Sequence, residues 1–137
     1  MIKDRKGFTL LELLIALAIL AIIAAILIPN FFATTDRARL RSDIQSARVI
    51  QNAIELYNAE RRTALDGSMT EILTNLTTAG FLRARYTFPQ TEGATWEIDD
   101  DIGVVVNIHT SPQNVHNIYA SLPESERNFV RGGRGGS

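Results

Sequence analysis

The sequence predicts an α+β protein in which one long N-terminal helix carries a small head with a short antiparallel sheet and one or two short helices. Three observations support this fold class. An apolar run extends from Phe8 to Phe32, with Glu12 as its one charged residue. An apolar helical period then continues to about Arg62, and the alternation typical of strands follows between residues 95 and 108.

The apolar run is long enough to cross a bilayer as a helix, for which about 20 apolar residues suffice. Lys3, Arg5 and Lys6 precede it, which favours a cytoplasmic N-terminus and an exported remainder. Glu12 would cost on the order of 2.5–3.5 kcal/mol at the bilayer centre and less near its edge. An acid in this position therefore indicates a function.

The second half of the long helix, after Pro29, is amphipathic. Because Pro29 lacks an N–H, the Ala25 carbonyl loses its donor, and a bend or local melting is expected there. Beyond it, apolar residues recur at spacings of three and four and predict one stripe that packs on the sheet. The stripe consists of Leu40, Ile44, Ala47, Ile50, Ile54 and Tyr57.

A second, shorter helix is expected after the break at residues 66–68. Ser68 and Glu71 have the spacing of a capping box, which predicts a helix of about ten residues. Gly80 fits the position just beyond its C-terminus. Tyr86 to Pro89 is expected to form a short strand or an extended segment, and Pro89 restricts it to an edge strand or a loop, since proline cannot donate to a central ladder.

The remaining elements complete the head. Strands are expected at residues 95–98 and 102–108, joined as an antiparallel hairpin that packs on the stripe. A third helix is expected at about residues 112–122, with a proline at its start. Residues 125–137 are polar and Gly-rich, which predicts a flexible tail.

The start of the chain resembles a known family. Lys6-Gly7-Phe8-Thr9-Leu10-Leu11-Glu12, followed by the apolar run, is similar to the class III signal of type IV pilins and type II secretion pseudopilins. The resemblance implies that a prepilin peptidase cuts between Gly7 and Phe8 and N-methylates Phe8. It also implies that Glu12 neutralises the Phe8 amine of a neighbouring subunit, and that Pro29 is the helix-kinking proline of the family.

The resemblance further implies a division of the chain and a function. Residues 1–7 would be the cleaved leader, 8–32 the transmembrane and filament-core helix, 33–124 the head and 125–137 the tail. The function would be structural, as a subunit of a type IV pilus or a type II secretion pseudopilus. Its partners would be prepilin peptidase, other copies and related pilins, and a membrane assembly platform. Before assembly it would be a single-pass protein of the cytoplasmic (inner) membrane, with the head outside.

Other interpretations of the N-terminus remain open. A minor tip subunit that binds DNA or a secreted substrate would carry the same signal. A plain signal anchor on an unrelated protein explains the hydrophobicity but not Glu12 in its Gly-Phe-Thr-Leu context. A secretory signal peptide cut after Ala18 would leave a long apolar tail on the product.

Composition narrows the possible chemistry. The chain contains no cysteine, which excludes disulfides, thiol nucleophiles and cysteine zinc sites. Many pilins close their C-terminal region with a disulfide, and this chain departs from that pattern. The formal net charge is −1, so nucleic acid is not expected as the main partner. No catalytic or phosphate-binding motif is present, and an enzyme is not expected.

The metal candidates in the head are weak. Asp99, Asp100 and Asp101 offer oxygen ligands for calcium, which major pseudopilins of type II secretion bind in a C-terminal loop, but a solvated turn is favoured. His109 and His116 lack a metal-binding context. No cofactor is therefore expected.

The head also holds candidate binding residues. Trp96, Tyr86 and Phe88 are expected to form core against the long helix rather than an exposed patch. The arginines at 61, 62, 83 and 85 could bind DNA, but a solvated face is favoured.

Overall fold

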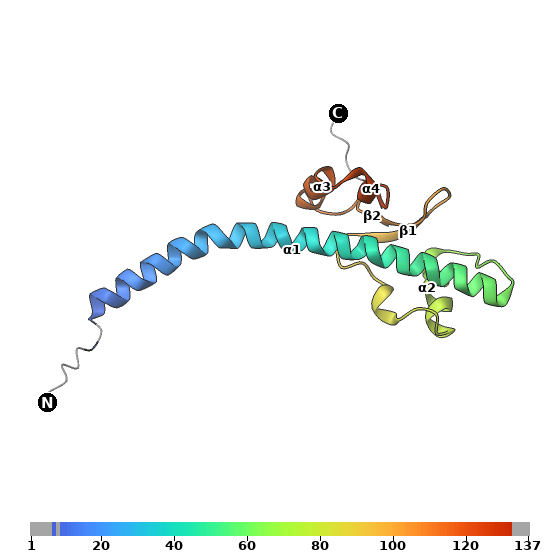
Figure 1. The fold of residues 1–137 in the computed structure, drawn as a ribbon, viewed down its shortest axis with the longest axis horizontal. Helices are drawn as coiled ribbons and strands as arrows, with labels where there is room; N and C mark the ends of the chain where they lie inside the picture. Colours follow the sequence, from blue (N-terminus) through green and yellow to red (C-terminus); the bar gives the residue numbers. More distant parts are fainter. Residues whose placement is uncertain (1–6, 8, 133–137) are drawn as a thin grey trace. The chain divides into compact units, whose positions relative to one another are not determined.

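A computed structural model describes residue 7 and residues 9–132. The chain divides into two compact units, one up to Thr34 and one from Thr35 onward. Helix α1, Leu10–Arg61, contributes to both (Figure 1). We call the described part of the second unit, residues 35–132, the head. The observed bounds of α1 confirm the long helix that the sequence predicts.

The N-terminal unit is the apolar half of α1. Its large apolar side chains, from Leu10 to Phe32, are exposed. Among the described residues, α1 is the one helix that is long and apolar enough to cross a membrane by length and composition. The helix does not unwind at Pro29, because residues 25–34 all remain helical. Just beyond it, the Thr34 hydroxyl donates to the Asn30 carbonyl at 2.8 Å.

The head forms its core between the second half of α1 and a small sheet. The predicted stripe on α1 is buried at every position up to Ile50, and Ile54 and Tyr57 are partly buried against the same core. In the sheet, four strand residues belong to this same core: Trp96, Val104, Val106 and Val130. The amphipathic pattern therefore predicted which side of α1 the sheet covers.

The sheet has three strands in the order β1-β2-β3. Strands β1, Thr95–Asp99, and β2, Gly103–Asn107, form the expected antiparallel hairpin, in which Trp96 pairs with Val106. Strand β3, Val130–Arg131, adds a short parallel pairing to β2. The sheet is thus mixed, whereas the sequence predicted an antiparallel hairpin alone.

Helix α2, Met69–Thr78, has both predicted ends. At its start, Ser68 and Glu71 form the reciprocal capping box. At its end, Gly80 has a φ of 82°, and the Phe81 N–H donates to the Leu76 carbonyl at 2.9 Å. This closes the helix in the glycine-dependent manner of a Schellman motif.

The segments around the sheet differ in part from the prediction. Instead of a strand at Tyr86, a 3-10 turn spans Ala84–Tyr86. Helix α3, Gln113–Ala120, lies within the predicted range, but Pro112 is its N-cap and not its first helical residue. Helix α4, Glu124–Arg127, and strand β3 occupy most of residues 125–132, the described part of the segment that was expected to be a flexible tail. Residues 133–137 of that tail lie outside the described residues.

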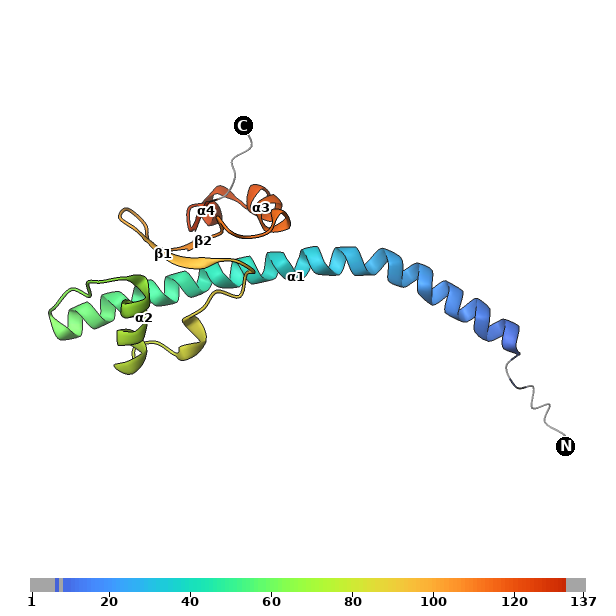
Figure 2. The ribbon, with the colours of Figure 1, turned by 180° about the vertical axis from the view of Figure 1, so that it is seen from behind.

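Three arginines of α1 contact the C-terminal segment that α3, α4 and β3 form. Arg37 donates to the Ser121 hydroxyl at 2.9 Å. Arg41 pairs with Glu126 at 3.1 Å, and the Arg48 guanidinium lies 4.6 Å from the centre of the Phe129 ring. In Figures 1 and 2, α3 and α4 lie on one side of α1 and α2 lies on the other.

Candidate functional site

Gly7 is the first described residue of the predicted processing site. It is exposed, and a Cβ added there would meet no other atom within 4 Å. The described residues therefore give no steric reason for glycine, and a requirement for glycine would belong to a peptidase that binds the segment. Phe8 lies outside the described residues, so cleavage and N-methylation there stay predictions.

Thr9 and Glu12 form a reciprocal capping box at the start of α1. The Thr9 N–H donates to Glu12 Oε2 at 3.1 Å, and the Glu12 N–H donates to Thr9 Oγ1 at 3.2 Å. Each side chain therefore satisfies a backbone donor that the first turn of a helix leaves without a partner. The carboxylate also lies at the N-terminal end of the helix, where a negative side chain interacts favourably with the helix dipole.

This arrangement lowers the cost of an acid at the edge of an apolar helix. In a bilayer, each backbone donor without a partner costs several kcal/mol, so the Glu12 carboxylate offsets part of its own desolvation by capping α1. Glu12 Oε1 has no hydrogen-bond partner among the residues that the structure describes. That oxygen is therefore available to a cation from outside the described residues.

This capping box was not predicted, although its signal is present in the sequence. Thr9-Leu10-Leu11-Glu12 has the same T/S-x-x-E spacing as Ser68-Met69-Thr70-Glu71, which was recognised. In the box at Ser68, the hydrogen bonds also change the acidity of the carboxyl group. The backbone N–H of Ser68, followed by its hydroxyl, stabilises the Glu71 carboxylate and lowers the pKa of Glu71 below its usual 4.5.

The aspartates of the β1–β2 turn are not equivalent. Asp99 is buried, its Oδ1 accepts the N–H groups of Asp101 and Ile102, and its Oδ2 pairs with Arg131. Asp100 and Asp101 are exposed. The structure gives Asp99 a structural role in the turn, which leaves two of the three carboxylates for a cation.

No other set of side chains in the described chain resembles a metal site. Among residue 7 and residues 9–132, no group of three or more His, Asp or Glu is placed to hold a metal ion. His109 is exposed and His116 is buried in α3. The two histidines therefore do not share an environment.

Three aromatic residues were predicted to form core against the long helix, and the prediction is correct for two of them. Trp96 is in the core, and Tyr86 packs partly buried against it. Phe88 is 81% exposed, so the expectation that it belongs to the core is wrong. The arginines at 61, 62, 83 and 85 are all exposed.

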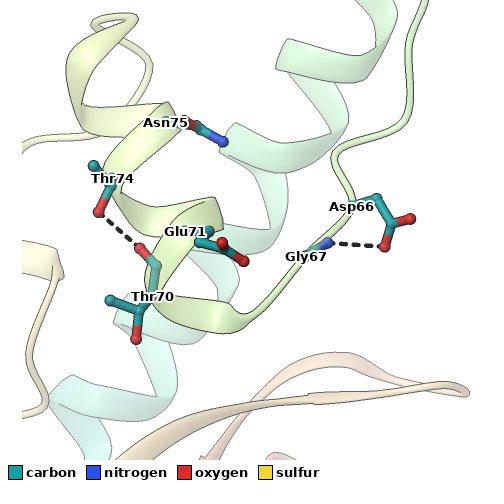
Figure 3. A pocket seen from close by; sticks show the side chains of 6 residues that line it. All are labelled: Asp66, Gly67, Thr70, Glu71, Thr74 and Asn75. Carbon is teal, nitrogen blue, oxygen red and sulfur yellow. Dashed lines mark hydrogen bonds between the residues drawn. The ribbon is translucent and has the colours of Figure 1, made fainter.

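The hollow drawn in Figure 3 lies at the start of α2 and has a volume of about 580 Å³. Its two acids already have local partners. Asp66 accepts the Gly67 N–H at 2.8 Å, and Glu71 accepts the Ser68 N–H at 2.8 Å. The carboxylates thus stabilise the turn that precedes α2, and nothing in the hollow points to a ligand.

Comparison with known proteins identifies the N-terminal segment. Residues 2–28 match the family described as the prokaryotic N-terminal methylation motif. The chain is 41% identical over 70 residues to prepilin peptidase-dependent protein A of Clostridium perfringens, which covers 51% of this chain and 49% of that protein. It is 61% identical over 36 residues to the type IV wide pilus major component PilA4 of Thermus thermophilus, covering 26% and 28% of the two chains.

A third similarity is to type II secretion system core protein G of Klebsiella michiganensis. The identity is 26% over 58 residues, which is 42% of this chain and 41% of that protein. The chain thus matches half or less of the length of these relatives. No solved structure matches it. The resemblance of the N-terminus to prepilin-type proteins is therefore confirmed. The chain carries the N-terminal methylation motif, and its relatives are type IV pilus, type II secretion and prepilin peptidase-dependent proteins.

Proposed function

We propose that this chain is a structural subunit of a type IV pilus or a type II secretion pseudopilus, which polymerises through the apolar half of α1. One observation carries the proposal. The methylation motif at residues 2–28 coincides with a helix whose large apolar side chains have no cover in the single chain. Such a surface needs lipid before assembly and other helices after it.

The physical driver is the replacement of lipid contacts by helix–helix packing. Leu10 to Phe32 supply the apolar surface, and Glu12 supplies the one charge. Its free carboxylate oxygen would accept the Phe8 amine of a neighbouring copy, since an opposite charge in an apolar medium is strongly attracted. A repeat in which one copy presents its amine to the next is heterologous and does not close, so it extends as a filament.

Processing and location follow from the same proposal. Prepilin peptidase would cut between Gly7 and Phe8 and methylate Phe8. The subunit would wait in the cytoplasmic membrane with its N-terminus inside, because Lys3, Arg5 and Lys6 precede the span. A membrane assembly platform would then bring it to other copies or related pilins.

A tip-only role and an enzymatic role are less well supported. One relative is by name the major component of a pilus, which favours a subunit that is repeated along a filament. In the described residues, the clustered acids serve as turn and helix caps. The described part of the head therefore supports a structural role better than a catalytic one.

The test is the mass of the N-terminal peptide, measured on membrane-extracted protein from a host that has the peptidase and an assembly system. We expect a peptide that begins with N-methyl-Phe8, together with filaments built mainly from this chain in electron micrographs. An intact Met1 in that host would overturn the proposal. The matched control is Gly7→Val, in which a bulkier residue should block processing.

A further inference from the structure

The head has a groove along one side of α1, and most of the side chains that line it are polar. The groove lies between α1 and residues 85–90, with a volume of about 280 Å³. Phe88 and Val49 line it and are 81% and 39% exposed. Phe88 is the most exposed large apolar side chain of the described head, so a partner that covers it would remove apolar surface from water.

The rim of this groove is positively charged. Arg85 lines it and lies 4.7 Å from the centre of the Tyr86 ring, which holds the guanidinium in place. Arg83 is exposed two residues earlier. The groove also contains Asp43, but that carboxylate is buried and accepts the N–H groups of Gln90 and Thr91. The charge that faces solvent here is therefore that of the arginines.

The hairpin tip, residues 98–102, has the complementary character. Asp100 and Asp101 are exposed and have no ion-pair partner among the described residues. Ile98 and Ile102 flank them and are 43% and 41% exposed. Asp99 is turned inward to Arg131, so the tip presents two negative charges beside two apolar side chains.

The two surfaces contain most of the large apolar side chains that the described head exposes. Of the large apolar side chains that the described head leaves exposed, all but Leu56 lie in the groove or on the hairpin tip. The tip lies on one side of α1 and residues 84–90 on the other (Figures 1 and 2). Because the surfaces are different and lie apart, each copy has both free, and a contact between them is heterologous, the kind that can repeat along a filament.

We propose that the hairpin tip of one copy docks into the groove of a second copy. Asp100 and Asp101 would face Arg83 and Arg85, while the two isoleucines would cover Phe88. This inference rests on the proposed function, which it deepens by naming the contact between heads. Opposite charges across such a contact set its register and exclude the reversed pairing.

Cysteine cross-linking tests the contact directly, because the chain has no cysteine of its own. Gln90 lines the groove and is exposed, and Asp100 is on the tip, so Gln90→Cys and Asp100→Cys place one thiol on each surface. We expect the double variant to form a ladder of disulfide-linked multimers. Co-expressed single variants should give dimers, and each single variant alone should give none.

The controls separate this contact from others. Gln90→Cys with Glu60→Cys, an exposed site outside both surfaces, should give no ladder. Dimers from one single variant alone would indicate a symmetric contact and would overturn the proposal. Filaments of the double variant without a ladder under oxidation would overturn it as well.

Charge reversal provides a second test that does not use cysteine. Arg83→Glu with Arg85→Glu should reduce filament yield by about tenfold or more, since like charges would then meet across the contact. Adding Asp100→Lys and Asp101→Lys should restore the yield. Phe88→Ala should reduce it, and Leu56→Ala, a similarly exposed residue outside both surfaces, should not. No restoration by the combined reversal would overturn the pairing.

Failure of the docking proposal can be distinguished from failure of the proposed function. Wild-type filaments that begin with N-methyl-Phe8, together with no ladder in the double-cysteine variant, would overturn the docking alone. A wild-type chain that keeps Met1 and forms no filament would overturn the function. Cross-linking of the double-cysteine variant is measured in membranes as well as in filaments. The contact between heads is therefore tested even if no filament forms.

Discussion

The buried carboxylate of Asp43 on α1 accepts the backbone N–H of Thr91 at 2.7 Å, which joins two residues 48 positions apart. Its other oxygen accepts the Gln90 N–H at 2.8 Å. Asp43→Ala should lower the free energy of unfolding by about 1–3 kcal/mol for each N–H that stays buried. Asp43→Asn should lower it less, because the amide keeps one acceptor. Urea unfolding of the detergent-solubilised chain checks this order, and equal losses would contradict it.

The ion pair of Arg131 with Asp99 should stabilise the end of the sheet. Asp99 is 3% exposed and Arg131 54%, so Arg131→Ala leaves a buried carboxylate without its cation. We expect a loss of about 1–3 kcal/mol, less than for a fully buried pair because water screens the arginine. A double-mutant cycle with Asp99→Asn measures the coupling. Strictly additive losses would show that the pair contributes nothing.

Glu12→Leu should leave membrane insertion intact and sharply reduce the number of filaments. The change makes the helix more apolar, so only the charge and the cap are lost. Thr9→Val is the matched control, since it removes the cap oxygen, worth about 0.5–2 kcal/mol, and keeps the carboxylate. Filament counts and membrane fractionation of both variants check this. Normal filament numbers in Glu12→Leu would count against its role in assembly.

The capping box of α2 should depend on pH in one direction. Folding lowers the pKa of Glu71, because the Ser68 N–H and hydroxyl favour the carboxylate. Its contribution to stability is therefore complete above about pH 4.5 and is lost as the pH falls through the lowered pKa. The stability advantage of the wild type over Glu71→Gln should shrink over that acidic range, as measured by thermal unfolding. An advantage that is independent of pH would contradict the assignment.

Calcium at millimolar concentration should not raise the melting temperature of the chain. The hairpin turn offers the cation only Asp100 and Asp101, whereas calcium takes six to eight oxygen ligands. Melting curves in calcium and in a chelator should coincide. A clear stabilisation that disappears in Asp101→Asn would show that the turn recruits further ligands.

The predictable parts of the fold are those that depend on neighbouring residues. The stripe on α1, the capping box at Ser68 and the glycine that ends α2 are local signals, and each was read correctly. Strand β3 was not predicted, because it has two residues and exists only by pairing with β2. Phe88 was misplaced for a similar reason, since an apolar residue next to a proline carries no local signal for exposure.

The candidate site was predictable to the same extent. The motif around Gly7 and Glu12 is contiguous in sequence, and the match to residues 2–28 confirms it. The partners of Asp99 were not predictable, because Arg131 is distant in sequence and reaches it only when β3 forms. Three adjacent aspartates therefore suggested a cation, whereas the fold uses the first one as an anchor.

The contacts of Arg37, Arg41 and Arg48 with the C-terminal segment have a consequence for the conditions that the head withstands. Guanidinium groups hold the C-terminal segment against α1, and the chain has no cysteine. These contacts therefore persist whatever the redox potential of the surroundings. Its sensitivity is instead to ionic strength, which screens exposed ion pairs. Reductants should therefore leave the head intact, and concentrated salt should loosen its C-terminal end first.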